Sequence, residues 1–188
     1  MISRLERAIA LAVELHRGQT RKGGDAPYVL HPFAVAALVA DHGGTEDEIA
    51  AALLHDAIED GGGDSARARL RDELGPNVLA IVEGCTDTDR VPKPPWRERK
   101  EAFIASLAGA PASVRLVIAA DKLHNARTTR RDLEQQGPVV WDRFRGGREG
   151  SLWYYRRVAE ELARGFEHPI VRELADEVGA LATAAGAA

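Results

Sequence analysis

Apolar residues along this chain recur mainly at helical spacing. Near the N-terminus they stand three and four positions apart up to about His16: Leu5, Ala8, Ile9, Ala12 and Val13. This spacing is typical of an amphipathic helix. Ser3 and Glu6 have the spacing of a capping box, which predicts where the helix begins. β-Branched residues form no alternating runs, so the pattern favours helix throughout.

Glycine and proline divide the rest of the chain into further predicted helices. Pro32 is well placed as the first residue of a second helix. Thr45 begins a third helix with the same capping-box spacing, and this helix carries His55 and Asp56 near its far end before the glycines at 61–63 stop it. Later helices are predicted over residues 64–74, 78–82, 96–107, 112–128, 151–166 and 169–184.

Three segments are predicted to be irregular. Residues 17–26 form a polar, glycine-bearing loop, and residues 86–95 contain three prolines. Residues 137–150 are rich in glycine, arginine and aromatic residues, and we interpret them as a surface loop and a candidate lid. The prediction is therefore an all-α helix bundle of about eight to ten helices, without internal repeats.

Size and composition limit the classes of protein to consider. A chain of 188 residues predicts a single domain over residues 1–188, with a tail that frays from about residue 180. Cys85 is the one cysteine, so no intramolecular disulfide can form, and a cytoplasmic location fits. No segment approaches the roughly 20 apolar residues needed to cross a bilayer. The net charge of −4 argues against nucleic-acid or anionic-membrane partners.

Four polar residues crowd the end of the third predicted helix: His55, Asp56, Glu59 and Asp60. On a continuous helix, residues three and four apart share a face, so an imidazole and three carboxylates would lie in one patch. Carboxylates that close repel one another unless a cation lies among them. The cluster predicts either a metal site or a solvated, acidic helix end.

Two further residues favour the metal interpretation. His31 precedes Pro32, and Asp121 ends an apolar helical run. Taken singly, His31 is explained by a hydrogen-bonded loop histidine and Asp121 by an ion pair with Lys122. Together with His55 and Asp56 they supply two imidazoles and two carboxylates, a set that suits a divalent first-row metal and leaves coordination positions for water.

The chain resembles the HD-domain metal-dependent phosphohydrolases, whose pattern is His…His-Asp…Asp. Within that superfamily it is similar to the (p)ppGpp hydrolases, namely the hydrolase half of bifunctional alarmone enzymes and the small alarmone hydrolases. The resemblance covers roughly residues 1–170 and rests on four segments in order: Gly18–Gly23, Pro27–Pro32, Leu53–Asp60 and Ala120–Thr128. It implies an HD-domain helical bundle with a central metal site. Without room for a synthetase domain, we expect degradative activity only.

The resemblance also implies roles for the clustered residues. His31, His55, Asp56 and Asp121 would ligate one metal ion, expected to be Mn²⁺, although ligand type alone would also admit iron or zinc. Glu59 and Asp60 would jointly position and deprotonate the attacking water and protonate the leaving oxygen. Alternatively, these two carboxylates are hydrogen-bonding partners of the histidines.

Substrate contacts are expected at several further positions. Asn125 and Thr128 share the helix face of Asp121 and would contact ribose or phosphate oxygens. The cations Arg21 and Lys22 would flank the purine, and the alternative is a pair of ordinary solvated cations. Arg148 would bind distal phosphates, as would Lys93, Arg97 or Arg145, and Tyr155 would lie near the nucleotide or belong to the core.

The expected reaction is hydrolysis of the 3′-pyrophosphate of ppGpp or pppGpp, giving GDP or GTP and pyrophosphate. A second enzymatic reading keeps the site but takes another ribose-phosphorylated nucleotide, such as NADPH or an adenine alarmone. A third, from another class, is a non-catalytic nucleotide sensor or antitoxin-like binding protein, which would normally have lost a metal ligand or the Glu-Asp pair. The sequence leaves the oligomeric state open.

Overall fold

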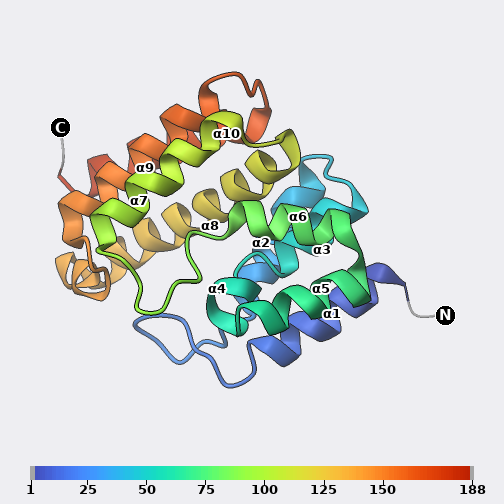
Figure 1. The fold of residues 1–188 in the computed structure, drawn as a ribbon. Helices are drawn as coiled ribbons and strands as arrows, with labels where there is room; N and C mark the ends of the chain where they lie inside the picture. Colours follow the sequence, from blue (N-terminus) through green and yellow to red (C-terminus); the bar gives the residue numbers. More distant parts are fainter. Residues whose placement is uncertain (1–2, 187–188) are drawn as a thin grey trace. The chain divides into compact units, whose positions relative to one another are not determined.

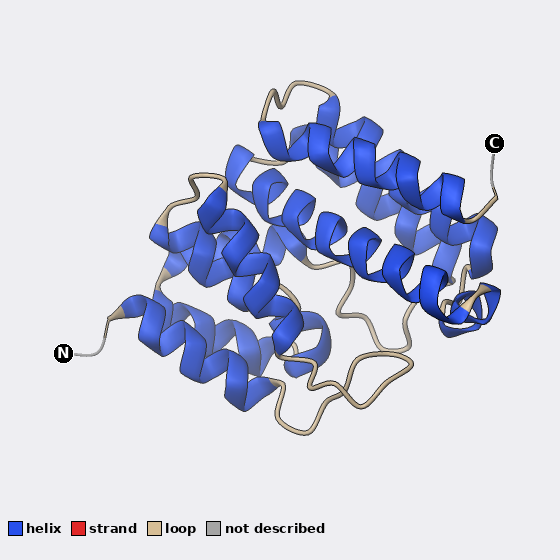
Figure 2. Ribbon diagram, turned by 180° about the vertical axis from the view of Figure 1, so that it is seen from behind, coloured by secondary structure: helices blue, strands red, loops and turns tan. Residues whose placement is uncertain are grey.

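The computed structural model describes residues 3–186, apart from the side-chain environment of residues 60–61, and every regular element in that range is a helix (Figures 1 and 2). Ten α-helices and two 3₁₀ helices lie within the described residues. The all-α prediction and the expected number of helices are therefore confirmed.

The chain falls into two compact units. Unit 1 comprises the residues up to Lys93 together with Pro111–Ile118, and unit 2 comprises Pro94–Ala110 together with the residues from Ala119 onward. The helices of unit 1 are α1 (Arg4–Leu15), α2 (Leu30–Asp41), α3 (Glu46–Leu53), α4 (Ala57–Gly61), α5 (Asp64–Leu74) and α6 (Pro76–Cys85). Those of unit 2 are α7 (Trp96–Ser106), η1 (Leu107–Gly109), most of α8 (Ala112–Gln136), η2 (Pro138–Arg143), α9 (Gly147–Ala163) and α10 (Pro169–Ala184).

Helix α3 lies at the core of unit 1, where it packs against α1, α2 and α6. Its last four residues, 50–53, are all buried, and three of them are alanines. Side chains this small let neighbouring helices approach closely on every side. The capping boxes predicted at Ser3 and Thr45 are both formed, so the predicted starts of α1 and α3 are confirmed.

Helix α9 lies at the core of unit 2 and packs against α7 and α10. Buried residues recur at helical spacing along α9 and α10: Leu152, Tyr155, Val158, Leu162, Ile170, Leu174, Val178 and Leu181. At the start of α9, Gly146 leaves room for the Trp96 ring, because a Cβ at this position would come within 2.7 Å of a ring carbon. Within the described residues, no helix has both the length and the apolar character needed to cross a membrane.

Several predicted boundaries are wrong. Helix α8 continues to Gln136, beyond the predicted end at residue 128, and α10 stays helical to Ala184, so the chain does not fray from residue 180. Helix α2 begins at Leu30, so His31 lies in its first turn and not ahead of it. Pro32 is tolerated there because the N–H groups of a first helical turn have no intrahelical partner. The segment 137–150 is mostly helical: η2 occupies Pro138–Arg143, and α9 begins at Gly147. Val140 and Trp141 are buried in η2, and this apolar anchoring explains why the segment is not an open loop.

Candidate metal centre

The predicted third helix is interrupted at residues 54–56. Helix α3 ends at Leu53, and α4 begins at Ala57 with Asp56 as its N-cap. His55 provides the local reason, because its Nδ1 lies 2.9 Å from the carbonyl oxygen of Ala52. In a continuous helix that carbonyl would accept the N–H of Asp56. The imidazole takes this place, in the way that polar side chains compete with helical backbone bonds.

The interruption brings together residues that a continuous helix would hold apart. Adjacent residues on a helix do not face each other. Here His55 Nε2 lies 3.0 Å from Asp56 Oδ2, and His31 Nε2, from the first turn of α2, lies 3.9 Å from the same oxygen. One ligand atom from each of His31, His55 and Asp56 lies within 4.8 Å of the others. Three of the four predicted metal ligands therefore form one cluster.

The chemistry of this cluster suits a metal cation. The Ala52 carbonyl can only accept a hydrogen bond, so Nδ1 of His55 carries a proton and the lone pair of the neutral ring lies on Nε2. That lone pair faces a carboxylate oxygen. The His31 and His55 rings are 2% and 3% exposed and pack edge to face with centroids 5.1 Å apart. Two buried imidazole nitrogens and a carboxylate that converge on one point are a ligand set for a divalent metal ion.

Tyr28 also belongs to this cluster, although the sequence interpretation gave it no role. Its hydroxyl donates a hydrogen bond to Asp56 Oδ2, and its ring packs edge-on against His31 with centroids 5.7 Å apart. The one sequence signal is its position three residues before His31, at the entry to α2. Its partner is 28 residues away in the chain, which no local pattern indicates.

The two predicted catalytic carboxylates lie on α4. Glu59 is half-buried, and its Oε1 accepts from Lys93 Nζ at 2.8 Å. The side chain of Asp60 lies outside the described residues. Lys93, a candidate phosphate-binding residue, thus lies beside a proposed catalytic group. The expectation that Glu59 shares a continuous helix with His55 is wrong, because the chain leaves the helical conformation between them.

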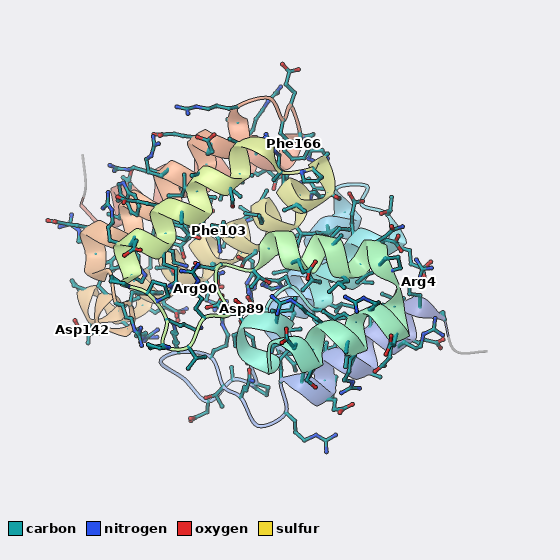
Figure 3. All side chains as sticks on the ribbon, viewed as in Figure 1. Arg4, Asp89, Arg90, Phe103, Asp142 and Phe166 are labelled. Carbon is teal, nitrogen blue, oxygen red and sulfur yellow. The ribbon has the colours of Figure 1, made fainter. Side chains whose placement is uncertain are left out.

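Arg67 anchors the segment that leads to Lys93. Its guanidinium donates to Asp89 at 2.6 Å, to Glu83 at 3.2 Å and to Asp64 at 3.2 Å, and Asp89 is labelled in Figure 3. The hydrogen bond with Asp89 raises the pKa of Arg67, and the same contact lowers the pKa of the Asp89 carboxyl. The irregular segment predicted at 86–95 is confirmed, and this ion-pair network ties it to α5.

Asp121, the fourth predicted ligand, belongs to unit 2 and is 6% exposed on α8. One of its carboxylate oxygens accepts from Lys122 Nζ and the other from Asn125 Nδ2. Asn125 therefore lies on the helix face of Asp121, as predicted, and it also contacts that carboxylate. The contact with Lys122 agrees with the ion-pair explanation of Asp121, and metal ligation by Asp121 stays a prediction.

The remaining predicted substrate residues have varied environments. Arg21 is half-buried, with its Cζ 5.9 Å from the centre of the Tyr28 ring, and Lys22 is exposed in the same loop. In unit 2, Thr128 is half-buried on α8, and Arg148 is exposed in the first turn of α9. Tyr155 is 7% exposed, which agrees with its alternative reading as a core residue.

Comparison with known proteins gives a consistent set of matches. The family model for the HD domain matches residues 8–152. A guanosine-3′,5′-bis(diphosphate) 3′-pyrophosphohydrolase of Haemophilus influenzae is 34% identical over 172 residues, which cover 88% of this chain and 23% of that protein. A GTP pyrophosphokinase of Streptomyces coelicolor is 37% identical over 131 residues, which cover 69% of this chain and 15% of that protein. The chain thus spans less than a quarter of the length of these two relatives.

Two solved structures resemble the chain over most of its length. One, described as a metazoan ortholog of SpoT that hydrolyzes ppGpp and plays a role in starvation responses, has a TM-score of 0.77 and 26% identity, and the match covers 93% of each chain. The other, lmo0812 from Listeria monocytogenes, has a TM-score of 0.71 and 29% identity, covering 79% of this chain and 96% of that one.

Proposed function

This chain belongs to the HD-domain family, and from that membership we propose that it is a metal-dependent phosphohydrolase acting on guanosine 3′,5′-bis(diphosphate). The proposed reaction hydrolyses the 3′-pyrophosphate of ppGpp or pppGpp to give GDP or GTP and pyrophosphate. The observation that carries this proposal is the convergence of His31, His55 and Asp56 within 4.8 Å. Relatives named for this reaction, and a similar structure described as hydrolyzing ppGpp, supply the substrate.

His31, His55 and Asp56 would hold the metal ion, with Asp121 as the proposed fourth ligand. When bound, a divalent ion supplies Lewis-acid chemistry: it lowers the pKa of a bound water and offsets phosphate charge. We propose Mn²⁺ as this ion. The imidazole and carboxylate ligands would also accept iron or zinc.

Glu59 and Asp60 are the proposed proton-transfer groups. In this proposal the pair accepts a proton from the attacking water and returns one to the leaving oxygen. Glu59 follows Asp56 by three residues, and α4 carries both carboxylates directly after the metal ligands. Lys93 pairs with Glu59 at 2.8 Å, so a phosphate oxygen bound near Glu59 would meet a positive charge there.

The base-binding side of the site is proposed to involve Arg21 and Lys22. Their loop is closed by the backbone bonds of Arg21 N–H to the Ala26 carbonyl and of Tyr28 N–H to the Gln19 carbonyl, both 2.9 Å. A planar guanidinium stacks on a purine and a lysine supplies a point charge, which fits this pair. The proposed contacts from unit 2 are Asn125, Thr128, Arg148 and Tyr155.

We also propose that residues 1–188 form one hydrolase domain. The HD-domain match extends over residues of both compact units, which supports a common function. The proposed substrate is a small anionic nucleotide, and neither a nucleic acid nor a membrane enters the proposal. A cytoplasmic location stays a prediction.

Pyrophosphate release from ppGpp by the purified chain tests the proposal. We expect release with Mn²⁺, none after chelation, and none from Asp56→Ala, which lacks a proposed metal ligand. A parallel assay with NADPH and an adenine alarmone tests the other nucleotide substrates. Metal binding without release from any of these nucleotides would refute the phosphohydrolase proposal and favour a binding role.

A further inference from the structure

Tyr28 is held from both sides at the point where the loop of residues 17–29 enters α2. Its N–H donates to the Gln19 carbonyl, and its own carbonyl accepts from His31 N–H, both at 2.9 Å. Its ring lies between two histidine rings, with centroids 4.9 Å from His16 and 5.7 Å from His31. His16 is buried, and its Nδ1 lies 2.9 Å from Gln19 Oε1. The Tyr28 ring is therefore fixed independently of its hydroxyl.

The hydroxyl of Tyr28 reaches the carboxylate oxygen on which the histidines converge. It donates to Asp56 Oδ2, which lies 3.0 Å from His55 Nε2 and 3.9 Å from His31 Nε2. A phenol has an ordinary pKa of about 10 and keeps its proton at neutral pH, so it is the donor. A hydrogen bond to an ionised carboxylate is stronger than one between neutral groups.

The hydrogen bond from Tyr28 restricts the orientation of the Asp56 carboxylate. Its side chain is 23% exposed, and the terminal torsion of an aspartate is broad, so its two oxygens exchange easily unless a donor holds one of them. We propose that Tyr28 is a positioning residue for the metal centre, whose hydroxyl holds Asp56 Oδ2 toward His31 and His55. This inference rests on the metal site of the proposed function.

The same ring connects the metal centre to the loop of residues 17–29. Arg21 Cζ lies 5.9 Å from the centre of the Tyr28 ring, so one side chain contacts both a proposed base-binding residue and a proposed metal ligand. Tyr28→Phe removes the hydroxyl and keeps the ring, its packing on His16 and His31, and its place below Arg21. The variant therefore isolates the bond to Asp56.

The test measures the dissociation constant of Mn²⁺ alone for the full chain by titration calorimetry. Groups that orient metal ligands typically contribute about 10–100-fold to metal affinity, so we expect Tyr28→Phe to raise the dissociation constant at least about tenfold. Tyr155→Phe removes the same atom from unit 2, and Arg21→Ala removes the guanidinium above the ring. Both controls should keep the wild-type metal affinity.

A kinetic readout separates positioning from a general structural role. For Tyr28→Phe, the Mn²⁺ concentration that gives half-maximal hydrolysis should rise by the same factor as the dissociation constant, and kcat should recover at saturating Mn²⁺. An unchanged dissociation constant would overturn the proposal. A loss of kcat that saturating Mn²⁺ does not restore would also overturn it, because the hydroxyl would then act on the reaction and not on metal binding.

The outcome for the wild-type chain separates this inference from the proposed function. If the wild type binds Mn²⁺ but releases no pyrophosphate from ppGpp, the proposed reaction fails, and the calorimetric comparison still decides the role of Tyr28. If the wild type binds none of manganese, iron and zinc, the metal centre and the positioning role fail together.

Discussion

Metal binding should stabilise the whole 188-residue chain against thermal unfolding. The ligand atoms of His31, His55 and Asp56 come from α2 and from the turn between α3 and α4, and the fold brings them within 4.8 Å. An unfolded chain has no such cluster, so a metal ion binds the folded state in preference. Preferential binding raises the free energy of unfolding by RT ln(1 + [metal]/Kd).

The size of the effect follows from this relation. At a free Mn²⁺ concentration about 100 times the dissociation constant, the added stability is about 2.7 kcal/mol. For a domain of 150–250 residues, each kcal/mol moves the unfolding midpoint by about 2–4 °C. Addition of Mn²⁺ to chelator-treated protein should therefore raise the midpoint by roughly 5–11 °C.

Calorimetric scans with Mn²⁺ and with chelator measure this shift in the unfolding midpoint. Two variants test whether the shift comes from metal bound at this cluster. Asp56→Asn keeps the shape of the side chain and can still accept a hydrogen bond from Tyr28, but it lacks the ligand charge, so most of the shift should disappear. Asp132→Asn removes a carboxylate that accepts from Arg143 at 3.0 Å in unit 2, and its shift should match the wild type. An equal rise in Asp56→Asn and the wild type would refute the assignment of the metal to this cluster.

Two further predictions concern packing and acid stability. Gly146→Ala should lower the free energy of unfolding, because overpacking against Trp96 costs about 1–3 kcal/mol and exceeds the gain of about 0.4–1 kcal/mol from losing a glycine. Gly179→Ala should raise the free energy of unfolding, because a Cβ at this position meets no atom within 4 Å outside its own helix. Urea titrations that give the two variants equal stability would contradict this prediction. Arg67 lowers the pKa of Asp89 from 3.8, so their ion pair contributes fully above that value and is lost as the pH falls through the lowered pKa. The stability difference between wild type and Arg67→Met should thus shrink when urea titrations are moved from pH 7 to below 3.8, and a constant difference would show that the pair does not contribute.

Features with local causes were predictable from the sequence. The capping boxes at Ser3 and Thr45 use residues three apart, and both are formed. Helix α10 has the predicted range of 169–184 because Pro169 begins it and apolar residues repeat along it. His31, His55 and Asp56 were predicted as ligands from their residue types and from the resemblance to the HD-domain phosphohydrolases, and the structure brings their ligand atoms together.

Features that depend on contacts distant in sequence were not predictable. The segment at 137–150 has the composition of a loop. Val140 and Trp141 are nevertheless buried, and residues 138–143 form a 3₁₀ helix. Tyr28 acts across 28 residues, and no periodicity indicates such a partner. Arg67 likewise holds Asp89 across 22 residues.

The interruption at residues 54–56 links the fold to the proposed chemistry through one residue. On a continuous helix, the side chains of His55 and Asp56 would point about 100° apart around the helix axis, so their polar atoms would diverge. Nδ1 of His55 donates a hydrogen bond to the Ala52 carbonyl, where α3 ends. Nε2 of the same ring faces Asp56 Oδ2. The contact that interrupts the helix therefore also fixes the tautomer that a metal requires. Any replacement of His55 that cannot donate to Ala52 would disturb the ligand geometry and the end of α3 together.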